Sequence, residues 1–284
     1  MNYAIEIKNL TKQFTGFTLD DLSLSVPSGA ITGLIGENGA GKSTTLKCIL
    51  GLLRPDSGSI TVLGGSPSDP EIRAQIGVVL DECPFHDSLT AEQVGRIMAG
   101  LYPTWHKELY LDYVKKFDLP KNLFVKEFSK GMKMKLSIAA ALAHHPKLLI
   151  LDEATGGLDP VVRNEILDEF LAFIRDEEHT VLLSSHITSD LERAADYITY
   201  LHKGKLALTG EKDALLEEHG RLVCTAAELE QVDPAWLVGT RKGQFGSEAL
   251  VRNKGEFLRR YPNLAVDPVT LEDIMVFTVR GDEQ

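Results

Sequence analysis

The sequence has few cysteines and no long apolar run. Its three cysteines, Cys48, Cys83 and Cys224, are widely separated and show no paired spacing suited to zinc. This pattern indicates a reduced, cytoplasmic protein. The most apolar runs, residues 136–143 and 148–151, are far shorter than the roughly 18 apolar residues of a membrane span. We therefore expect no segment of the chain to cross a bilayer.

The sequence also lacks an excess of positively charged residues. The net charge is -11 and the pI is about 5.2, which argues against a nucleic-acid partner because phosphate contacts need a basic surface. Residues 1–10 alternate apolar and polar side chains, so they lack the apolar core of a signal peptide and predict a strand. With 43% hydrophobic and 25% charged residues, 284 residues allow one large globular domain and a smaller one.

The first 53 residues predict strands followed by a loop and a helix. Residues 22–26 have the period of a half-buried strand, and residues 27–29 (Pro-Ser-Gly) supply a turn, so a hairpin-rich start is expected. Residues 30–35 form a short apolar run that leads into the glycine-rich residues 36–41. The following segment, residues 42–53, has helical spacing of its apolar residues.

Three segments predict the core of an α/β fold with a helical insertion. Residues 148–151 and 181–183 have the uniform apolar character of central parallel strands, and a helix is expected between them at about 161–175. Residues 89–145 lack strand alternation and are punctuated by prolines, which predicts an inserted helical subdomain at about 82–146.

The pattern changes after about residue 211. Short mixed segments follow, and an apolar-periodic helix is expected near residues 271–279. We therefore expect two domains, residues 1–220 and a small α+β accessory domain of residues 221–284.

Residues 36–43, Gly-Glu-Asn-Gly-Ala-Gly-Lys-Ser, match the phosphate-loop pattern between a predicted strand and a predicted helix. The glycines let backbone N–H groups turn toward phosphates, and the helix N-terminus adds positive potential. Lys42 is expected to reach the β- and γ-phosphate oxygens and Ser43 to ligate Mg²⁺. A chance glycine turn is the alternative, and the loop by itself indicates a ligand rather than a function. The expected nucleotide-binding residues here are Gly36, Glu37, Asn38, Gly39, Ala40, Gly41, Lys42, Ser43 and Thr44.

Two carboxylates follow the predicted strand at residues 148–151. The strand would deliver Asp152 and Glu153 to the carboxyl edge of the sheet, beside the phosphate loop. Asp152 is expected to hold Mg²⁺ through water, and Glu153 to accept a proton from the attacking water. Solvated acids at a strand end are the alternative. Because two carboxylates repel a triphosphate unless a cation is present, the expected cofactors are ATP and Mg²⁺.

Residues 128–132, Phe-Ser-Lys-Gly-Met, begin a helix that is apolar on two sides, and Met132 stands 20 residues before Asp152. Together with the phosphate loop and the Asp-Glu pair, they resemble the ABC ATPase family over about residues 1–220. The resemblance implies a P-loop NTPase (RecA-like) core with an N-terminal antiparallel β subdomain. It also implies a head-to-tail dimer in which Ser129, Lys130 and Gly131 contact the nucleotide of the partner subunit.

The family's commonest pattern at this loop is Leu-Ser-Gly-Gly-Gln, and this chain departs from it. Lys130 replaces the first of the paired glycines, and Met132 replaces the glutamine. Lys130 either adds a charge-assisted phosphate contact or points to solvent.

Further residues match the family's order. Gly157-Leu-Asp159 corresponds to the loop that communicates across the dimer, and His186 to the switch histidine near the γ-phosphate. Phe14 stands where the family stacks a ring on adenine, Phe17 is the rival, and core packing is the alternative. Asp81 replaces a frequent glutamine and is kept as a metal candidate, since a carboxylate binds metal but cannot donate a hydrogen bond.

Four aromatic or histidine side chains are candidates for a groove that receives a membrane subunit. Ordinary packing within the helical subdomain is the equally weighted alternative. They are Phe85, His86, Tyr102 and Trp105.

The expected function is therefore that of the ATP-binding and ATP-hydrolysing subunit of an ABC transporter. It would form a homodimer or heterodimer, associate with the cytoplasmic face of the membrane through separate permease subunits, and bind no nucleic acid. Residues 129–132 and 270–274 resemble bacterial ABC-2 type export ATPases, which implies export of an unidentified substrate. The alternative is a non-transport regulatory ABC-type ATPase or an ATP-sensing binding protein. A nucleoside kinase would share the phosphate loop but would not need residues 128–132 or His186.

Overall fold

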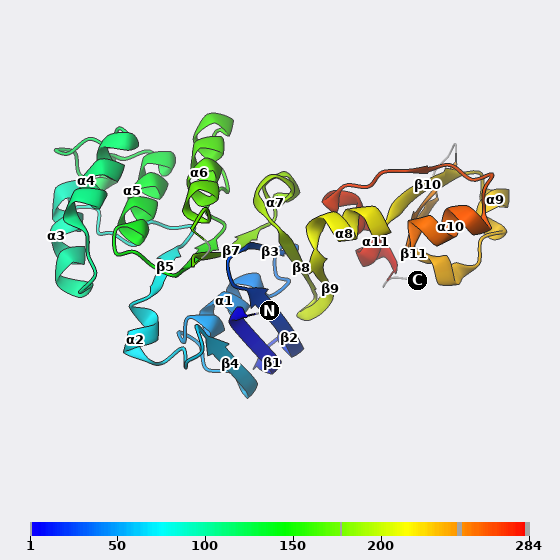
Figure 1. The fold of residues 1–284 in the computed structure, drawn as a ribbon, viewed down its shortest axis with the longest axis horizontal. Coiled ribbons are helices and arrows are strands. Elements are labelled where there is room, and N and C mark those ends of the chain that lie inside the picture. The colour runs from blue at the N-terminus through cyan, green and yellow to red at the C-terminus, as the bar shows by residue number, and fades with distance from the viewer. Residues whose placement is uncertain (1, 177, 243–245, 282–284) are drawn as a thin grey trace.

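A computed structural model describes residues 2–176, 178–242 and 246–281. In this part of the chain the strands form sheets of six, three and four strands. Figure 1 shows the helical subdomain and the small C-terminal sheet at opposite ends of the molecule, with the large sheet between them.

The six-stranded sheet has the order β5-β6-β7-β3-β8-β9. Neighbouring strands are parallel except for β9, which pairs with β8 in antiparallel orientation. Every residue of β3 and β7 is buried, which confirms the uniform apolar strands expected from the sequence. The strands are β3 (Ile31–Ile35), β5 (Ile76–Val79), β6 (Leu148–Asp152), β7 (Thr180–Ser185), β8 (Tyr197–His202) and β9 (Lys205–Glu211).

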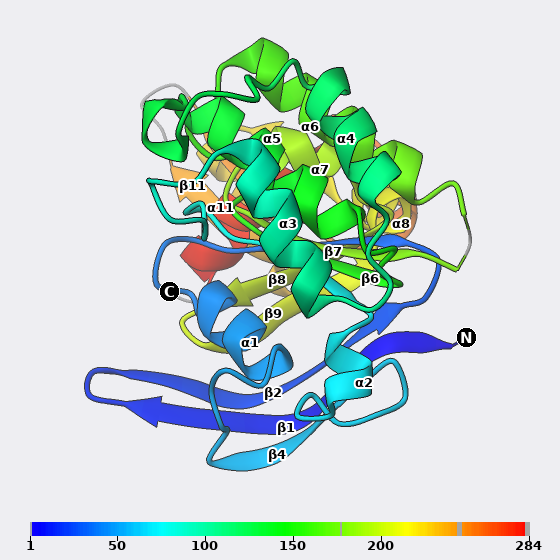
Figure 2. The same cartoon turned by 90° about the vertical axis from the view of Figure 1, so that its left-hand side faces the viewer.

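An antiparallel sheet, β2-β1-β4, lies under one face of the large sheet, with the helix α1 (Lys42–Ile49) between them (Figure 2). Its strands are β1 (Tyr3–Phe14), β2 (Phe17–Pro27) and β4 (Ser57–Val62), and β1 and β2 form the expected hairpin. The helix α1 ends at Ile49, four residues earlier than expected. The left-handed backbone of Gly51, with φ of 64°, turns the chain out of the helix. A short helix, α2 (Pro70–Arg73), leads into β5.

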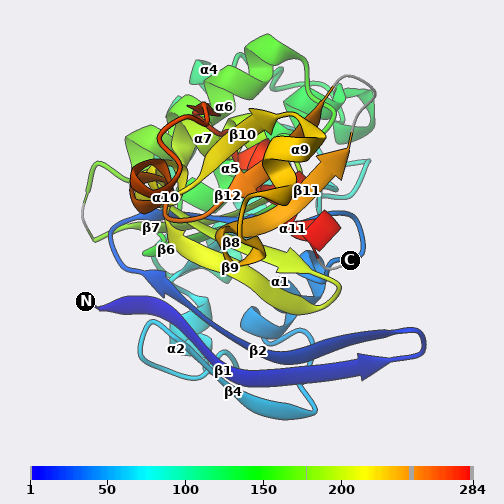
Figure 3. The same ribbon diagram turned by 90° about the vertical axis from the view of Figure 1, so that its right-hand side faces the viewer.

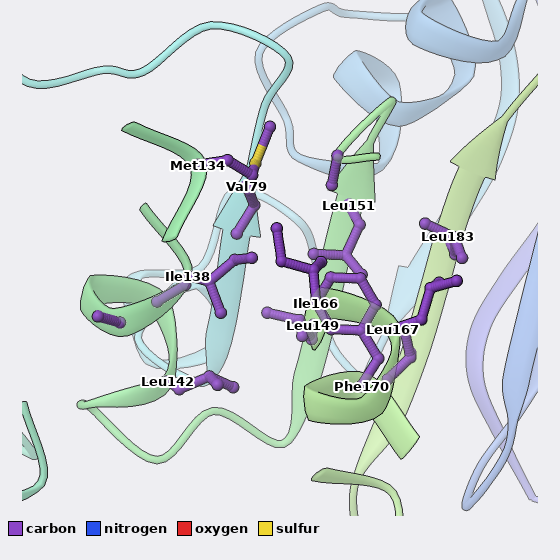
Figure 4. Packing of buried hydrophobic residues seen from close by; sticks show 14 of the residues in the cluster. Val79, Met134, Ile138, Leu142, Leu149, Leu151, Ile166, Leu167, Phe170 and Leu183 are labelled. Atoms are coloured by element: carbon purple, nitrogen blue, oxygen red, sulfur yellow. The ribbon is translucent and has the colours of Figure 1, made fainter. Parts of the chain in front are cut away.

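Helices α5 (Lys130–Leu142), α6 (Pro160–Phe173) and α7 (Thr188–Ala194) pack on the other face of the large sheet. Helices α3 (Ala91–Leu101) and α4 (Lys107–Lys116) pack on α5, which the 3₁₀ turn η1 (Val125–Glu127) precedes. The elements from α3 to α5 lie between β5 and β6 in the chain, which confirms the expected insertion of helices there. In Figure 4, Ile138 and Leu142 of α5 face Leu149 of β6 and the α6 side chains Ile166 and Phe170. The helical subdomain and the sheet therefore share one core, which holds the beginning of α5 in place.

The C-terminal unit combines a four-stranded antiparallel sheet with short helices, as expected, and Figure 3 shows it facing the viewer. Its first strand, β10, begins at Gly220, so the expected division after residue 220 falls inside a strand. We propose the boundary one residue earlier, at His219. Helix α8 (Lys212–Glu218) leads from β9 to this unit, whose elements are β10 (Gly220–Cys224), α9 (Ala226–Glu230), η2 (Pro234–Trp236), β11 (Leu237–Lys242), β12 (Ser247–Val251), α10 (Lys254–Arg260), β13 (Val266–Asp267) and α11 (Leu271–Gly281).

Helix α11 attaches this unit to the core around the six-stranded sheet. Thr270 and Asp273 cap its start reciprocally, since the amide of each donates to the side chain of the other. The carboxylate of Glu192 on α7 accepts a further hydrogen bond of 2.7 Å from the amide of Leu271. Leu271 belongs to the main core, whereas Phe277 packs in the cluster below the C-terminal sheet. The segment that resembles export ATPases is thus the joint between the two units.

Within the described ranges, no helix combines the length and apolar character needed to span a bilayer.

Candidate functional site

A cavity of about 710 Å³ lies where the loop between β3 and α1 meets the ends of β5, β6 and β7. Its position at the carboxyl edge of a parallel sheet is the usual place for a ligand in open α/β folds. Eleven of the residues expected at the site line it, namely Glu37, Asn38, Gly39, Gly41, Lys42, Ser43, Thr44, Asp81, Lys130, Glu153 and His186.

Two residues of the phosphate loop do not line the cavity but fix the loop's shape. A Cβ atom at Gly36 would lie 2.6 Å from the carbonyl oxygen of Leu201, so only glycine fits where the loop passes β8. Ala40 is buried, and its carbonyl accepts a hydrogen bond of 3.0 Å from the amide of Gly204. The loop is therefore held against the end of β8 and the turn that follows it.

Lys42, Glu153 and His186 form a continuous chain of polar contacts. The Lys42 Nζ atom donates to the carbonyl of Gly36 at 2.8 Å and lies 3.3 Å from the Oε1 atom of Glu153. The other carboxylate oxygen, Oε2, lies 2.6 Å from the Nδ1 atom of His186. Lys42 is only 6% exposed. Three separate elements, α1, β6 and β7, thus bring an ammonium, a carboxylate and an imidazole together.

The two carboxylates at the end of β6, those of Asp152 and Glu153, lie in different surroundings. Glu153 adopts a left-handed conformation with φ of 53°, and its amide donates to the carbonyl of Ser184 at 3.0 Å. This conformation is costly for a residue other than glycine and is held by that hydrogen bond. The buried Oδ1 atom of Asp152 has no hydrogen-bond partner in the described structure. Asp152 does not line the cavity, whereas Ser43 does. A buried carboxylate oxygen without a partner and a serine hydroxyl are both of the oxygen type that Mg²⁺ takes as a ligand.

In the loop at residues 128–132, the three residues expected to contact a nucleotide are placed differently. The hydroxyl of Ser129 accepts a hydrogen bond from the amide of Met132 and caps α5, while Gly131 packs against Val162, where a Cβ atom would lie 3.2 Å from Cγ1. Neither lines the cavity. Lys130 does line it, and its Nζ atom lies 3.0 Å from the Oδ1 atom of Asp81. In this chain Lys130 is therefore paired with Asp81 across the cavity rather than pointing freely into solvent.

Asp159 also lies outside the cavity. Its carboxylate accepts hydrogen bonds from the amides of Val161 and Val162 and caps α6. Of the two aromatic candidates, Phe17 lines the cavity and Phe14 does not, although their rings are only 6.4 Å apart.

The groove candidates have partners inside the helical subdomain. Tyr102 stacks on His144 at 4.1 Å, and Trp105 packs against Tyr110 at 5.1 Å. His86 forms a hydrogen bond with Ser88, and Phe85 packs on the core. These contacts favour the ordinary packing alternative, above all for Tyr102 and Trp105.

The sequence analysis missed His202 at the end of β8. This residue is 5% exposed, and its Nδ1 atom lies 2.9 Å from the Oε1 atom of Glu37 in the phosphate loop. No sequence signal links the two residues, because only the strand order β3-β8 brings them together.

The fold and the loop define a P-loop NTPase. The family model described as "ABC transporter" matches residues 19–156. The lantibiotic transport ATP-binding protein SrtF of Streptococcus pyogenes is 38% identical over 74% of this chain and 91% of its own length. The Nod factor export ATP-binding protein I of Rhizobium leguminosarum bv. viciae is 34% identical over 96% of this chain and 94% of its own.

A solved structure of the ATP-binding subunit of an ABC transporter superposes with a TM-score of 0.68 at 31% identity, covering 75% of this chain and 92% of that one. A second solved structure is a dimeric ATP-binding cassette in a post-hydrolysis state with ADP and phosphate. It superposes with a TM-score of 0.66 at 24% identity, and the match covers 73% of this chain and 98% of that one. This similarity shows the shared fold. The chain belongs to the family of ABC transporter ATP-binding proteins. It is an ATPase subunit of that family.

Proposed function

We propose that this chain hydrolyses Mg²⁺-ATP to drive export of a substrate through separate membrane subunits. The relative named for lantibiotic transport supports a role in transport, and the relative named for Nod factor export supports the outward direction. The second of these aligns over 96% of this chain, so its similarity includes the C-terminal unit as well as the ATPase core. The cargo itself is not specified by any residue of the site.

The contacts of Lys42 support its role in phosphate binding. Its ammonium group is held by the Gly36 carbonyl and the Glu153 carboxylate at the base of the phosphate loop. A triphosphate presents more negative charge than a single carboxylate, so Lys42 would exchange Glu153 for the β- and γ-phosphate oxygens. That exchange releases Glu153 to accept the proton of the attacking water.

The single observation that carries the proposal is the position of the Glu153 carboxylate between Lys42 and His186. From there it acts as the general base, and His186 orients it and contacts the γ-phosphate. Ser43 and Asp152 would hold Mg²⁺, which supplies charge neutralisation at the phosphates. Asp81 reaches the cavity from β5 and would assist at the metal.

The position of Ser129 and Gly131 outside their own chain's cavity supports a head-to-tail dimer. These residues stand at the start of α5 and do not line their own chain's cavity. The helix N-terminus is suited to a phosphate, which a partner subunit would provide. Asp159, at the start of α6, would lie in the same interface. The dimer, a homodimer or a heterodimer, would associate with the cytoplasmic face of the membrane through the permease subunits.

The proposal is tested by isolating the tagged chain from membranes in mild detergent and measuring ATP hydrolysis with and without Mg²⁺. We expect Mg²⁺-dependent turnover and a co-purifying polytopic membrane protein. Lys42→Ala should lose turnover but keep the membrane protein. Turnover without any membrane partner would favour the regulatory ABC-type ATPase, and nucleotide binding without turnover would favour the ATP sensor.

A further inference from the structure

Two loops meet at the cavity and lead directly into two packed helices. Residues 156–159 precede α6, and residues 186–187 precede α7. The loops approach each other here, since a Cβ atom at Gly156 would lie 4.0 Å from the Cε1 atom of His186, and both residues line the cavity. The first turns of α6 and α7 are the segments that follow these loops directly.

An ion pair joins these first turns. Arg163 stands four residues after Asp159, and Asp190 stands four residues after His186. The Nε atom of Arg163 lies 2.5 Å from the Oδ1 atom of Asp190, and its NH2 group donates to the hydroxyl of Ser189 at 2.8 Å.

The Asp190 carboxylate is buried, so it depends on Arg163 to compensate its charge. Asp190 is 2% exposed, and its Oδ2 atom has no hydrogen-bond partner within the described ranges. Arg163 is thus the one cation that compensates this carboxylate in the described structure, and the low local dielectric strengthens the attraction. A neutral side chain at either position would release the two first turns from each other.

The same helices carry a second, exposed tie farther from the cavity. Arg193 in the last turn of α7 pairs with Asp168 in α6 at 2.6 Å and also contacts Asn164. The Asp168 side chain is 62% exposed, so this pair adds little to stability. It joins the same two helices without reaching either loop, which makes it a matched control.

We infer that Arg163 and Asp190 are positioning residues for ATP hydrolysis, which hold His186 against Glu153 by locking the first turn of α6 to the first turn of α7. Neither residue lines the cavity or touches the nucleotide site. The inference rests on the proposed roles of Glu153 and His186.

The first test compares Asp190→Asn with Asp168→Asn by steady-state ATP hydrolysis, ATP binding and thermal unfolding. Asp190→Asn should lower kcat about tenfold or more while changing the Kd for ATP less than about twofold, because a small displacement of a catalytic group affects the reaction more than binding. Asp168→Asn should keep both values within about twofold of the parent. Arg163→Lys retains the charge but loses the forked contact to Asp190 and Ser189, and should also lower kcat. It serves as the test if Asp190→Asn does not fold.

The second test is a double-mutant cycle with His186→Ala. If Asp190 acts through His186, Asp190→Asn should cost kcat in the parent and cost little more in the His186→Ala background. An equal loss in both backgrounds would overturn the inference, as would a parent-background loss no larger than that of Asp168→Asn. Retention of full turnover by His186→Ala itself would instead refute the proposed role of His186. The two failures are therefore distinguishable.

Discussion

The Oε2 atom of Glu153 lies 2.6 Å from Nδ1 of His186, while its Oε1 atom lies 3.3 Å from Nζ of Lys42. The carboxylate of Glu153 therefore contacts both the lysine that would bind the phosphates and the histidine that would contact the γ-phosphate. Under the proposed function, this side chain would couple nucleotide binding to catalysis, because a phosphate that binds Lys42 would free one oxygen of Glu153.

Glu153→Gln should keep or raise the affinity for ATP and lower turnover by about a hundredfold or more. The amide no longer attracts Lys42 as a charged partner, and it cannot act as a base. Equilibrium binding of ATP and steady-state phosphate release measure the two effects. The variant should also accumulate as an ATP-bound dimer in size-exclusion chromatography.

The matched control for this variant is Glu92→Gln, on the exposed surface of α3, where Glu92 pairs only with Arg96 at 3.5 Å in the described structure. Turnover of this control should equal that of the parent. A Glu153→Gln protein that remained a monomer with normal turnover would contradict both the base assignment and the dimer.

Asp81→Asn should raise the Mg²⁺ concentration needed for half-maximal ATP hydrolysis. The amide oxygen is a weaker metal ligand than a carboxylate. The contact with Lys130 is half exposed on both sides, so its loss should change the free energy of unfolding by no more than about 1 kcal/mol.

Lys130→Met separates the two possible roles of Asp81, which are pairing with Lys130 and binding Mg²⁺. This variant breaks the ion pair but keeps the carboxylate of Asp81. If the Mg²⁺ requirement shifts equally in Asp81→Asn and Lys130→Met, the ion pair matters and metal binding by Asp81 does not. Titration of Mg²⁺ at saturating ATP gives the comparison.

Stability should fall in mildly acidic solution, and His144 should contribute to the loss. Burial lowers the pKa of His144, and nearby His145 lowers it further, whereas hydrogen bonds to the carbonyls of Ile76 and Ala140 raise it. The folded state therefore binds this proton at lower pH than the unfolded state does. The free energy of unfolding decreases as pH falls below about 6.5, the ordinary value for histidine, and levels off below the lowered pKa.

Urea unfolding at pH 7.5 and pH 5.5 measures this loss. The variant His144→Gln, which has no titrating ring, should show a smaller difference between the two pH values than the parent. An unchanged difference would exclude His144 as a source of the acid sensitivity.

Glu192→Ala should loosen α11 without unfolding the ATPase core. The carboxylate of Glu192 accepts the hydrogen bond from the Leu271 amide, and loss of a cap of this kind costs about 1 kcal/mol. Hydrogen exchange at the amides of α11 should accelerate, while the amides of β3 and β7 remain protected. Glu192→Gln keeps an acceptor oxygen and should exchange as the parent does; equal acceleration in both variants would contradict the capping role.

Much of the fold followed from local patterns. The central strands β3, β6 and β7 and the helices of the insertion were predictable because uniform apolar runs and helical spacing reflect burial on both faces of a sheet or on one side of a helix. The predicted end of α1 was wrong by four residues, because the apolar spacing continues to Leu53 while the backbone turns at Gly51. Helix length there depends on backbone conformation rather than on side-chain pattern.

The sequence by itself indicated a phosphate-binding loop at residues 36–43 and a pair of carboxylates, Asp152 and Glu153, at the end of β6, because each of these two motifs is contiguous in the chain. Only the tertiary structure decided that Lys130 pairs with Asp81, that Phe17 rather than Phe14 lines the cavity, and that Arg163 joins Asp190. These contacts join residues that are far apart in the chain, or depend on the direction in which a hairpin side chain points. Strand order and helix packing fix them, and no local pattern of residues records that geometry.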